Sequence, residues 1–242
     1  MLETISRNGP ATAANIAALT RVDRTTTYRL LETMRRDGYL HYNEDSKHYS
    51  MAEAMTRLVD GVSAVDLTST VVSAELSRLL PKVQWPSDFA TVSVGELVIR
   101  DSTHRLSPFS IHRAMVGRSR SLLDSALGRA VIAAATDEDR QQLVELSVRH
   151  GKIGATEFGV DAKVKQIISD FKVKGYTWSV DNTETGISAI ALPVRDPFNV
   201  IGAVNIIFFT SALSPAEAAQ KYLSYLTDTV TRIEARISQI IR

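Results

Sequence analysis

The chain has 242 residues, of which 44% are apolar and 23% are charged, and its formal net charge is +1. This balance excludes a disordered chain and supplies enough apolar material for one large domain or two small ones. There is no cysteine, which excludes disulfides and thiolate sites, and no apolar run is long enough to span a bilayer. We therefore expect a soluble cytoplasmic protein without a membrane partner.

The first fifty residues predict two short helices around a tight turn, followed by a β-hairpin. Thr12 is placed to cap the first helix and Asp23 the second. The second helix has a core-facing stripe at positions i, i+3, i+4 and i+7, formed by Thr27, Leu30, Leu31 and Met34.

Hydroxyl and basic side chains gather at the start of the second helix. Between Arg21 and Arg36 there are five arginines and two acids, so this segment has a local charge of +3 in a nearly neutral chain. In a helix-turn-helix this end enters the major groove, where such side chains contact phosphates and base edges. The alternative is a solvated amphipathic helix. The predicted DNA contacts are Arg24, Thr25, Thr26, Tyr28, Arg29 and, from the hairpin, Lys47.

The hairpin alternates around the polar turn 43–46 and completes a winged helix-turn-helix over residues 1–50. Residues 51–65 predict a linker helix, which would present one apolar side to a partner helix. That side consists of Met51, Met55, Leu58 and Val59.

From residue 66 to residue 242 the pattern alternates between helices and apolar strands. A helix is expected up to Pro81, a strand pair around Gly95 and Glu96, and a long final helix capped by Ser214 and Glu217. The segments 187–195 and 200–209 are almost entirely apolar, which predicts strands buried on both faces. The fold class is α+β, with a twisted, mainly antiparallel sheet flanked by helices.

Catalytic motifs are missing from the sequence. There is no G-x-S-x-G elbow, no phosphate-binding loop and no conspicuous carboxylate pair, and His104 and His112 make only a weak zinc pair. We therefore expect neither an enzyme nor a cofactor. A hydrolase of small acids is the alternative.

A binding pocket is better supported by the segment 104–118. It combines histidines and arginines with apolar residues and contains no acid, which suits an organic carboxylate. Its candidate contacts are Arg105, His112, Arg113 and Met115; the alternative is a solvated basic loop. Asn205 is a lone polar residue in an apolar strand and requires a partner. Either a ligand or an internal carbonyl can supply it, and we favour the ligand.

Three stretches, "RTTTYRLLETMRRDGYL", "SALGRAVIAA" and "GISAIALPVRD" with "VIGAVNIIFF", resemble the IclR family of bacterial transcription regulators. The resemblance covers essentially the whole chain. It implies a winged helix-turn-helix, a linker helix, a GAF-like effector domain and assembly as a homodimer or homotetramer. It also implies effector contacts at Ala126, Leu127, Asp181, Ala189, Asn205 and Ile207. Many members carry serine at the last two positions, so the ligand contacts are expected to differ.

Residues 83–123 are similar to the subgroup that controls phenylpropionate and related aromatic-acid catabolism. The resemblance implies a regulator that binds a double-stranded DNA operator and responds to a small effector, with an aromatic carboxylate as the expected chemistry. A constitutive DNA-bound scaffold without an effector is a further alternative.

Overall fold

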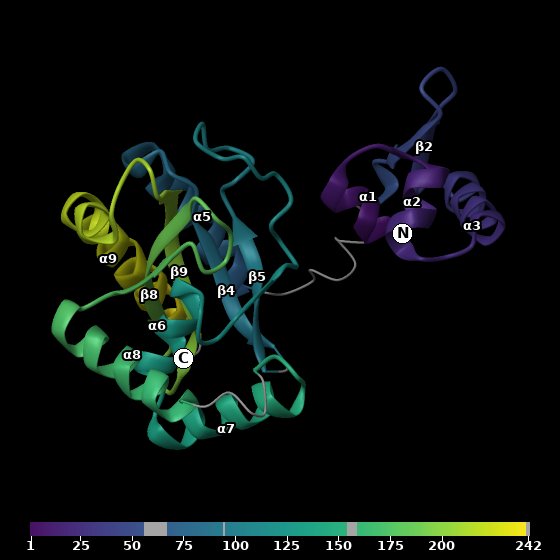
Figure 1. The fold of residues 1–242 in the computed structure, drawn as a ribbon. Helices are drawn as coiled ribbons and strands as arrows, with labels where there is room; N and C mark the ends of the chain where they lie inside the picture. The colour runs from purple at the N-terminus through teal and green to yellow at the C-terminus, as the bar shows by residue number, and fades with distance from the viewer. Residues whose placement is uncertain (56–66, 94, 154–158, 241–242) are drawn as a thin grey trace. The chain divides into compact units, whose positions relative to one another are not determined.

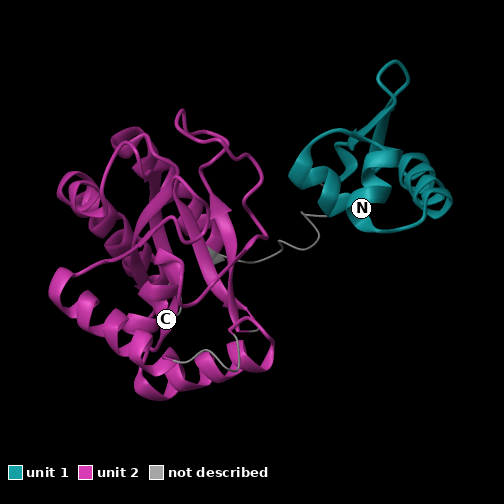
Figure 2. Cartoon of the chain, in the orientation of Figure 1, with its two compact units in different colours: residues 1–66 teal, residues 67–242 magenta. Residues whose placement is uncertain are grey.

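The computed structural model describes residues 1–55, 67–93, 95–153 and 159–240. The chain divides into two compact units, residues 1–66 (unit 1) and 67–242 (unit 2), coloured separately in Figure 2. Most of the predicted linker helix over 51–65 lies outside the described residues. Within the described ranges no helix is both long and apolar enough to cross a membrane.

Unit 1 is a winged helix-turn-helix. Its three-stranded sheet has the order β1-β3-β2, with Tyr42 opposite Tyr49 in the wing. Both predicted caps are confirmed, because Asn15 N donates to Thr12 Oγ1 and Thr26 N donates to Asp23 Oδ1. The elements are α1 (Leu2–Asn8), β1 (Ala11–Thr12), α2 (Ala13–Thr20), α3 (Arg24–Arg36), β2 (Leu40–Asn43) and β3 (His48–Met51).

One residue of the predicted core-facing stripe of α3 is not buried in the core of unit 1. Thr27 and Leu31 are fully buried, but Leu30 is 41% exposed. On the helix, Leu30 lies at the outer edge of the apolar stripe, whose centre is formed by residues 27, 31 and 34. Unit 1 is small, and the rest of its core covers only the centre of this stripe. Tyr49 is buried and donates through its hydroxyl to Glu32 Oε1 at 2.8 Å, which fixes the wing to α3.

Unit 2 is a six-stranded antiparallel sheet with the order β6-β5-β4-β9-β8-β7, flanked by helices (Figure 1). The strands are β4 (Asp88–Ser93), β5 (Glu96–Ser102), β6 (Ser119–Arg120), β7 (Thr177–Val180), β8 (Ile187–Arg195) and β9 (Val200–Phe209). The helices are α5 (Leu67–Val83), α6 (Ala126–Ala134), α7 (Asp137–Arg149), α8 (Val160–Lys174) and α9 (Pro215–Ile240).

Strands β8 and β9 are buried on both faces, as their apolar sequences predict. In β8, Ile190 and Leu192 pack in the cluster that contains α5 and α9, whereas Ala189 and Ala191 pack with α6 and α8. This alternation follows from the two-residue period of a strand. The small alanines on the second face leave room for α6 to lie close to the sheet.

Helices α5 and α9 are joined by a buried carboxylate. Glu75 is fully buried and accepts from Arg78 at 2.8 Å and from Arg232 at 2.7 Å. The predicted end of α5 at Pro81 is wrong, because the helix continues to Val83 and Gln84 N donates to Leu80 O. A proline removes one donor but does not prevent the last turn from closing behind it.

The two halves of the sheet meet where β4 pairs with β9, a contact that we call the seam. Its ladder contains the pairs Phe89–Val204 and Ala90–Ala203. A side chain at Gly202 would place its Cβ 2.2 Å from Ala90 O, so only glycine permits this approach. Beyond Phe89 the pairing changes, and Asp88 N donates at 2.7 Å to the side-chain oxygen of Asn205 instead of to a backbone carbonyl.

Candidate functional site

In unit 1, a groove runs between the start of α2, the exposed face of α3 and the wing. Five of the six predicted DNA contacts line it: Arg24, Thr25, Tyr28, Arg29 and Lys47. The groove is also lined by Thr12, Ala13, Ala14, Tyr42 and Tyr49, so its described wall carries three cations and no acid. This combination suits a phosphate backbone and base edges.

Thr26 is the predicted contact that the structure does not bring to this groove. Its backbone N–H is used by the Asp23 cap at 2.9 Å. The hydrogen bonds to Thr26 lower the pKa of Asp23. The carboxylate therefore stays ionised and continues to cap the N-terminus of α3. Thr26 therefore contributes to the turn that orients its neighbours Thr25 and Arg29.

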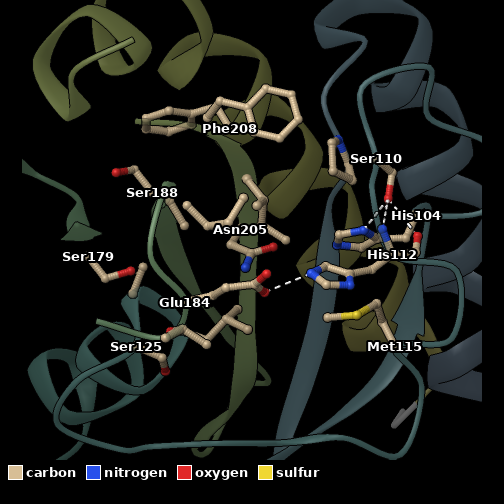
Figure 3. A pocket seen from close by; sticks show the side chains of 18 of the residues that line it. His104, Ser110, His112, Met115, Ser125, Ser179, Glu184, Ser188, Asn205 and Phe208 are labelled. Atoms are coloured by element: carbon tan, nitrogen blue, oxygen red, sulfur yellow. Dashed lines mark hydrogen bonds and ion pairs between the residues drawn. The ribbon is translucent and has the colours of Figure 1, made fainter. Parts of the chain in front are cut away.

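In unit 2, a cavity lies beside the stretch of β9 from Asn205 to Phe209 (Figure 3). The space between its walls is about 630 Å³ when the part open to solvent is included. Its walls come from the loop 103–118, the loop 181–186, the start of α6, and strands β8 and β9. Seven of the ten predicted effector contacts line it: His112, Met115, Ala126, Leu127, Ala189, Asn205 and Ile207.

The other three predicted contacts lie outside the lining. Arg105 and Arg113 are exposed, and Arg105 Nε donates to the carbonyl of Arg113 at 3.2 Å, which holds the loop together from outside. Asp181 Oδ1 accepts from Gly186 N at 2.7 Å and from Thr210 Oγ1 at 3.0 Å. Asp181 therefore closes the loop 181–186 instead of facing the cavity.

Arg120 is a cavity residue that the sequence pattern did not reveal. It lies on β6, and it forms no ion pair with a carboxylate in the described part of the chain. Burial lowers its pKa, and the nearby charge of Asp88 opposes that change. The pairing of Leu97 with Arg120 brings this residue to the cavity, and a two-residue strand has no recognisable sequence signal.

The start of α6 adds a second group that favours anions. Ser125 caps the helix by accepting from Gly128 N at 3.0 Å, while the first-turn residues Ala126 and Leu127 line the cavity. The first N–H groups of a helix have no partner within the helix and carry a partial positive charge. These groups and Arg120 both line the cavity, and both favour a carboxylate.

Two loops are joined across the cavity by one contact. His112 Nε2 lies 2.7 Å from Glu184 Oε2, as the dashed line in Figure 3 shows. His112 belongs to the loop 103–118 and Glu184 to the loop 181–186, so this hydrogen bond spans the cavity wall. Both side chains are partly exposed, and a ligand that enters here would compete with or reinforce this contact.

A buried polar corner lies beside the cavity. Asp88 is fully buried and its carboxylate oxygens have no hydrogen-bond partner among the described residues. Burial raises the pKa of Asp88 to about 6, against smaller lowering effects of Ser102 and Arg120. His104 Nε2 lies 3.7 Å from Asp88 Oδ1, and burial lowers the pKa of His104 to about 4.

The described residues contain no cluster of three or more metal-ligating His, Cys, Asp or Glu side chains. The hydrogen-bond partner that the structure gives Asn205 is internal, because the backbone N–H of Asp88 donates to its side-chain oxygen. It also lines the cavity. The arrangement in unit 2 therefore suits recognition of a small polar molecule by hydrogen bonds and charge.

Two family models match the chain. Residues 1–44 match the IclR helix-turn-helix domain, and residues 62–235 match the bacterial transcriptional regulator IclR C-terminal domain. The chain belongs to the IclR family. It is therefore a transcriptional regulator with a C-terminal effector-binding domain, and since members of the IclR family are not enzymes, the hydrolase alternative is dropped.

Several IclR relatives extend over nearly the whole chain. The HTH-type transcriptional regulator KdgR of Escherichia coli is 25% identical over 89% of this chain and 81% of its own length. The Thermotoga maritima IclR structure has a TM-score of 0.73 at 15% identity, covering 98% and 95% of the two chains. An IclR homologue from Microbacterium hydrocarbonoxydans, solved with 4-hydroxybenzoate, has a TM-score of 0.67 at 17% identity, covering 94% and 91%.

The buried corner predicts a specific pH dependence of stability. Because its pKa is raised from 3.8 to about 6, Asp88 contributes stability that is complete below about pH 4 and lost as pH rises through about 6. His104 acts in the opposite direction, since its pKa is lowered from 6.5 to about 4: its contribution is present above about pH 6.5 and lost as pH falls through about 4.

Replacing Asp88 by Asn removes the charge and keeps the backbone N–H that binds Asn205. We expect the variant to match the wild type at pH 4 and to exceed its free energy of unfolding by about 2 kcal/mol at pH 8. Urea denaturation at both pH values measures this difference. A difference between the two proteins that does not change with pH would contradict the assignment.

Proposed function

We propose that this IclR-family regulator reads its operator through the groove of unit 1 and that a small carboxylic acid in the cavity of unit 2 controls operator binding. The observation that carries the proposal is Arg120, a partly buried cation in the cavity wall that forms no ion pair with a carboxylate among the described residues. Arg120 donates to Ser119 O at 2.9 Å, and the charges of Asp88 and Glu184 act on it from a distance. An anionic ligand would add the direct charge-assisted hydrogen bond that these groups do not provide.

An aromatic acid is the chemistry that the remaining walls favour. Phe109, Phe208 and Phe209 line the cavity together with Met115 and Leu127. Rings and a thioether make favourable contacts with an aromatic ligand. The IclR homologue with bound 4-hydroxybenzoate supports the same class. The operon that this chain regulates is accordingly proposed to serve aromatic-acid catabolism.

The control mechanism is a population shift. The acid would bind best to the arrangement in which Arg120, α6 and the two loops joined by His112 and Glu184 face one another. A ligand changes an equilibrium only by its differential affinity for the two arrangements. The same acid would therefore alter the geometry of assembly and, through it, the affinity for the operator.

We also propose that the chain acts as a homodimer or homotetramer. Unit 1 is small, so a single head has a limited contact area, and two heads on paired half-sites provide the specificity that one lacks. Analytical ultracentrifugation at micromolar concentration should show a dimer or tetramer, both with and without DNA. A monomer under both conditions would contradict this proposal.

Replacing Arg29 by Ala should weaken specific operator binding by about 1–3 kcal/mol and relax sequence preference, because Arg29 lines the groove in a position to reach base edges. The measurement is a binding titration on the DNA upstream of the chain's own gene. Arg36→Ala is the matched control: it removes the same charge from the other end of α3, outside the groove. Equal effects of the two substitutions would remove the groove assignment.

Replacing Arg120 by Met should weaken acid binding by about 1.5–3 kcal/mol, because a charge-assisted hydrogen bond is lost while the side-chain volume is kept. Arg113→Met removes a charge from the same region outside the lining, and should leave the affinity nearly unchanged. Calorimetry with benzoate and 3-phenylpropionate measures both. If Arg113→Met abolishes binding and Arg120→Met does not, the exposed loop is the true anion site.

A further inference from the structure

The placement of the wing relative to α3 decides which cations of unit 1 can contact a duplex together. Lys47 lies at the tip of the wing and Arg29 on α3, and both line the groove. Lys47 has a φ of 58°, in the left-handed region, and Asn43 Oδ1 accepts from Ser46 N at 2.9 Å within the same turn. The shape of the tip is therefore set locally, but its direction depends on the strands β2 and β3 that carry it.

A hydrogen bond between side chains joins the wing to α3. Tyr49 follows Lys47 by two residues on β3, and its hydroxyl donates to Glu32 Oε1 at 2.8 Å. Tyr49 is 1% exposed, so its hydroxyl is not available to DNA although the residue borders the groove. Burial raises the pKa of Tyr49, and the adjoining Glu32 carboxylate raises it further, so the hydroxyl keeps the proton that it donates.

Arg35 holds Glu32 in the orientation that this bond requires. Arg35 Nη2 and Nε lie 2.9 Å and 3.0 Å from Glu32 Oε2, so each carboxylate oxygen has its own partner. The two residues are three positions apart on one helix, a spacing at which side chains meet. The hydrogen bond from Arg35, and then that from Tyr49, lower the pKa of Glu32, so the carboxylate stays ionised at neutral pH. The acceptor for Tyr49 is therefore fixed to α3.

An acid on this helix is unfavourable for DNA binding unless it serves another purpose. The second helix of a helix-turn-helix enters the major groove, where a carboxylate repels the phosphates on either side. The side chain of Glu32 is 26% exposed, so its charge is not hidden by burial. The bond to Tyr49 supplies the compensating role, because it connects the helix to the strand that carries Lys47.

We propose that Glu32 and Tyr49 are positioning residues of unit 1, whose hydrogen bond directs the wing so that Lys47 contacts a phosphate while α3 lies in the major groove. Without this bond the wing would have to be ordered when DNA binds, and the lost conformational freedom would offset the gain from the phosphate contact. This inference rests on the proposed function of the groove and adds the two residues that orient its parts.

The test uses the salt dependence of binding, which measures the number of phosphate contacts and does not follow from stability alone. Fluorescence anisotropy with the full chain and the DNA upstream of its own gene gives the affinity at several salt concentrations between about 50 and 200 mM. Tyr49→Phe removes only the hydroxyl. We expect it to weaken binding about fivefold for each head at about 150 mM salt, and to reduce the salt slope by about 1 for each head, as the loss of one phosphate contact requires.

A double-variant cycle shows whether the hydrogen bond acts through Lys47. Lys47→Ala should weaken binding as much as Tyr49→Phe does, and it should have little further effect when Tyr49→Phe is already present. Glu32→Met breaks the same bond from the side of α3, and Lys47→Ala should have little further effect in this variant too. The second variant decides the question if Tyr49→Phe does not fold, which thermal denaturation shows.

Two controls separate the hydrogen bond from its surroundings. Glu32→Gln removes the charge but keeps an acceptor for Tyr49, so it should keep the salt slope. Tyr39→Phe makes the same chemical change at a partly buried tyrosine that precedes β2 and does not line the groove. It should bind DNA with the affinity and the salt slope of the wild type.

The outcomes separate this inference from the proposed function. A reduced slope in Tyr49→Phe, with little further effect of Lys47→Ala, supports the inference. An unchanged slope in Tyr49→Phe, or an equal effect of Lys47→Ala with and without it, overturns the inference while the groove remains a DNA site. A slope that falls as much in Glu32→Gln or Tyr39→Phe also overturns it. If Lys47→Ala and Arg29→Ala both leave binding unchanged, the proposed function of the groove fails, and this inference fails with it.

Discussion

The architecture of unit 2 depends on the seam between β4 and β9. These strands are far apart in the sequence, and their pairing joins the two halves of the sheet. Gly202 makes the approach possible, because any Cβ there would meet Ala90 O at 2.2 Å. The Asn205 side chain then accepts a hydrogen bond from the Asp88 amide at a break in the ladder, so that a buried donor keeps its partner. The backbone pairing resumes where Ile207 N donates to Pro86 O at 2.9 Å.

The cavity lies beside this irregular stretch of the pairing. The loop 103–118 and the loop 181–186 both line it, and His112 Nε2 and Glu184 Oε2 join the two loops at 2.7 Å. The group that closes the seam, Asn205, therefore also faces the ligand space. Asn205 both binds the Asp88 amide and lines the cavity, so a substitution there would affect both stability and binding. A variant at Arg120 separates the two roles better.

Local rules were enough to predict much of the fold from the sequence. The caps at Thr12 and Asp23, the burial of β8 on both faces and the capping box of Ser214 and Glu217 depend on neighbours within a few residues. The site was less predictable because long-range pairing decides it. Arg105 and Arg113 share the basic loop with His112 but point outside, whereas Arg120 reaches the cavity through its pairing with β5. Likewise, no local pattern shows that the backbone N–H of Asp88, 117 positions away in the sequence, donates to the side chain of Asn205.

The central claim is that a small acid acts at the end of the seam. Amide hydrogen exchange of the full chain, with and without saturating 3-phenylpropionate, tests it most directly, since binding slows the local opening of the segments that hold the ligand. The account predicts slower exchange in the loops 103–118 and 181–186 and in the first turn of α6, with the largest change beside Arg120. Bound acid that leaves these segments unchanged and protects another region instead would contradict it.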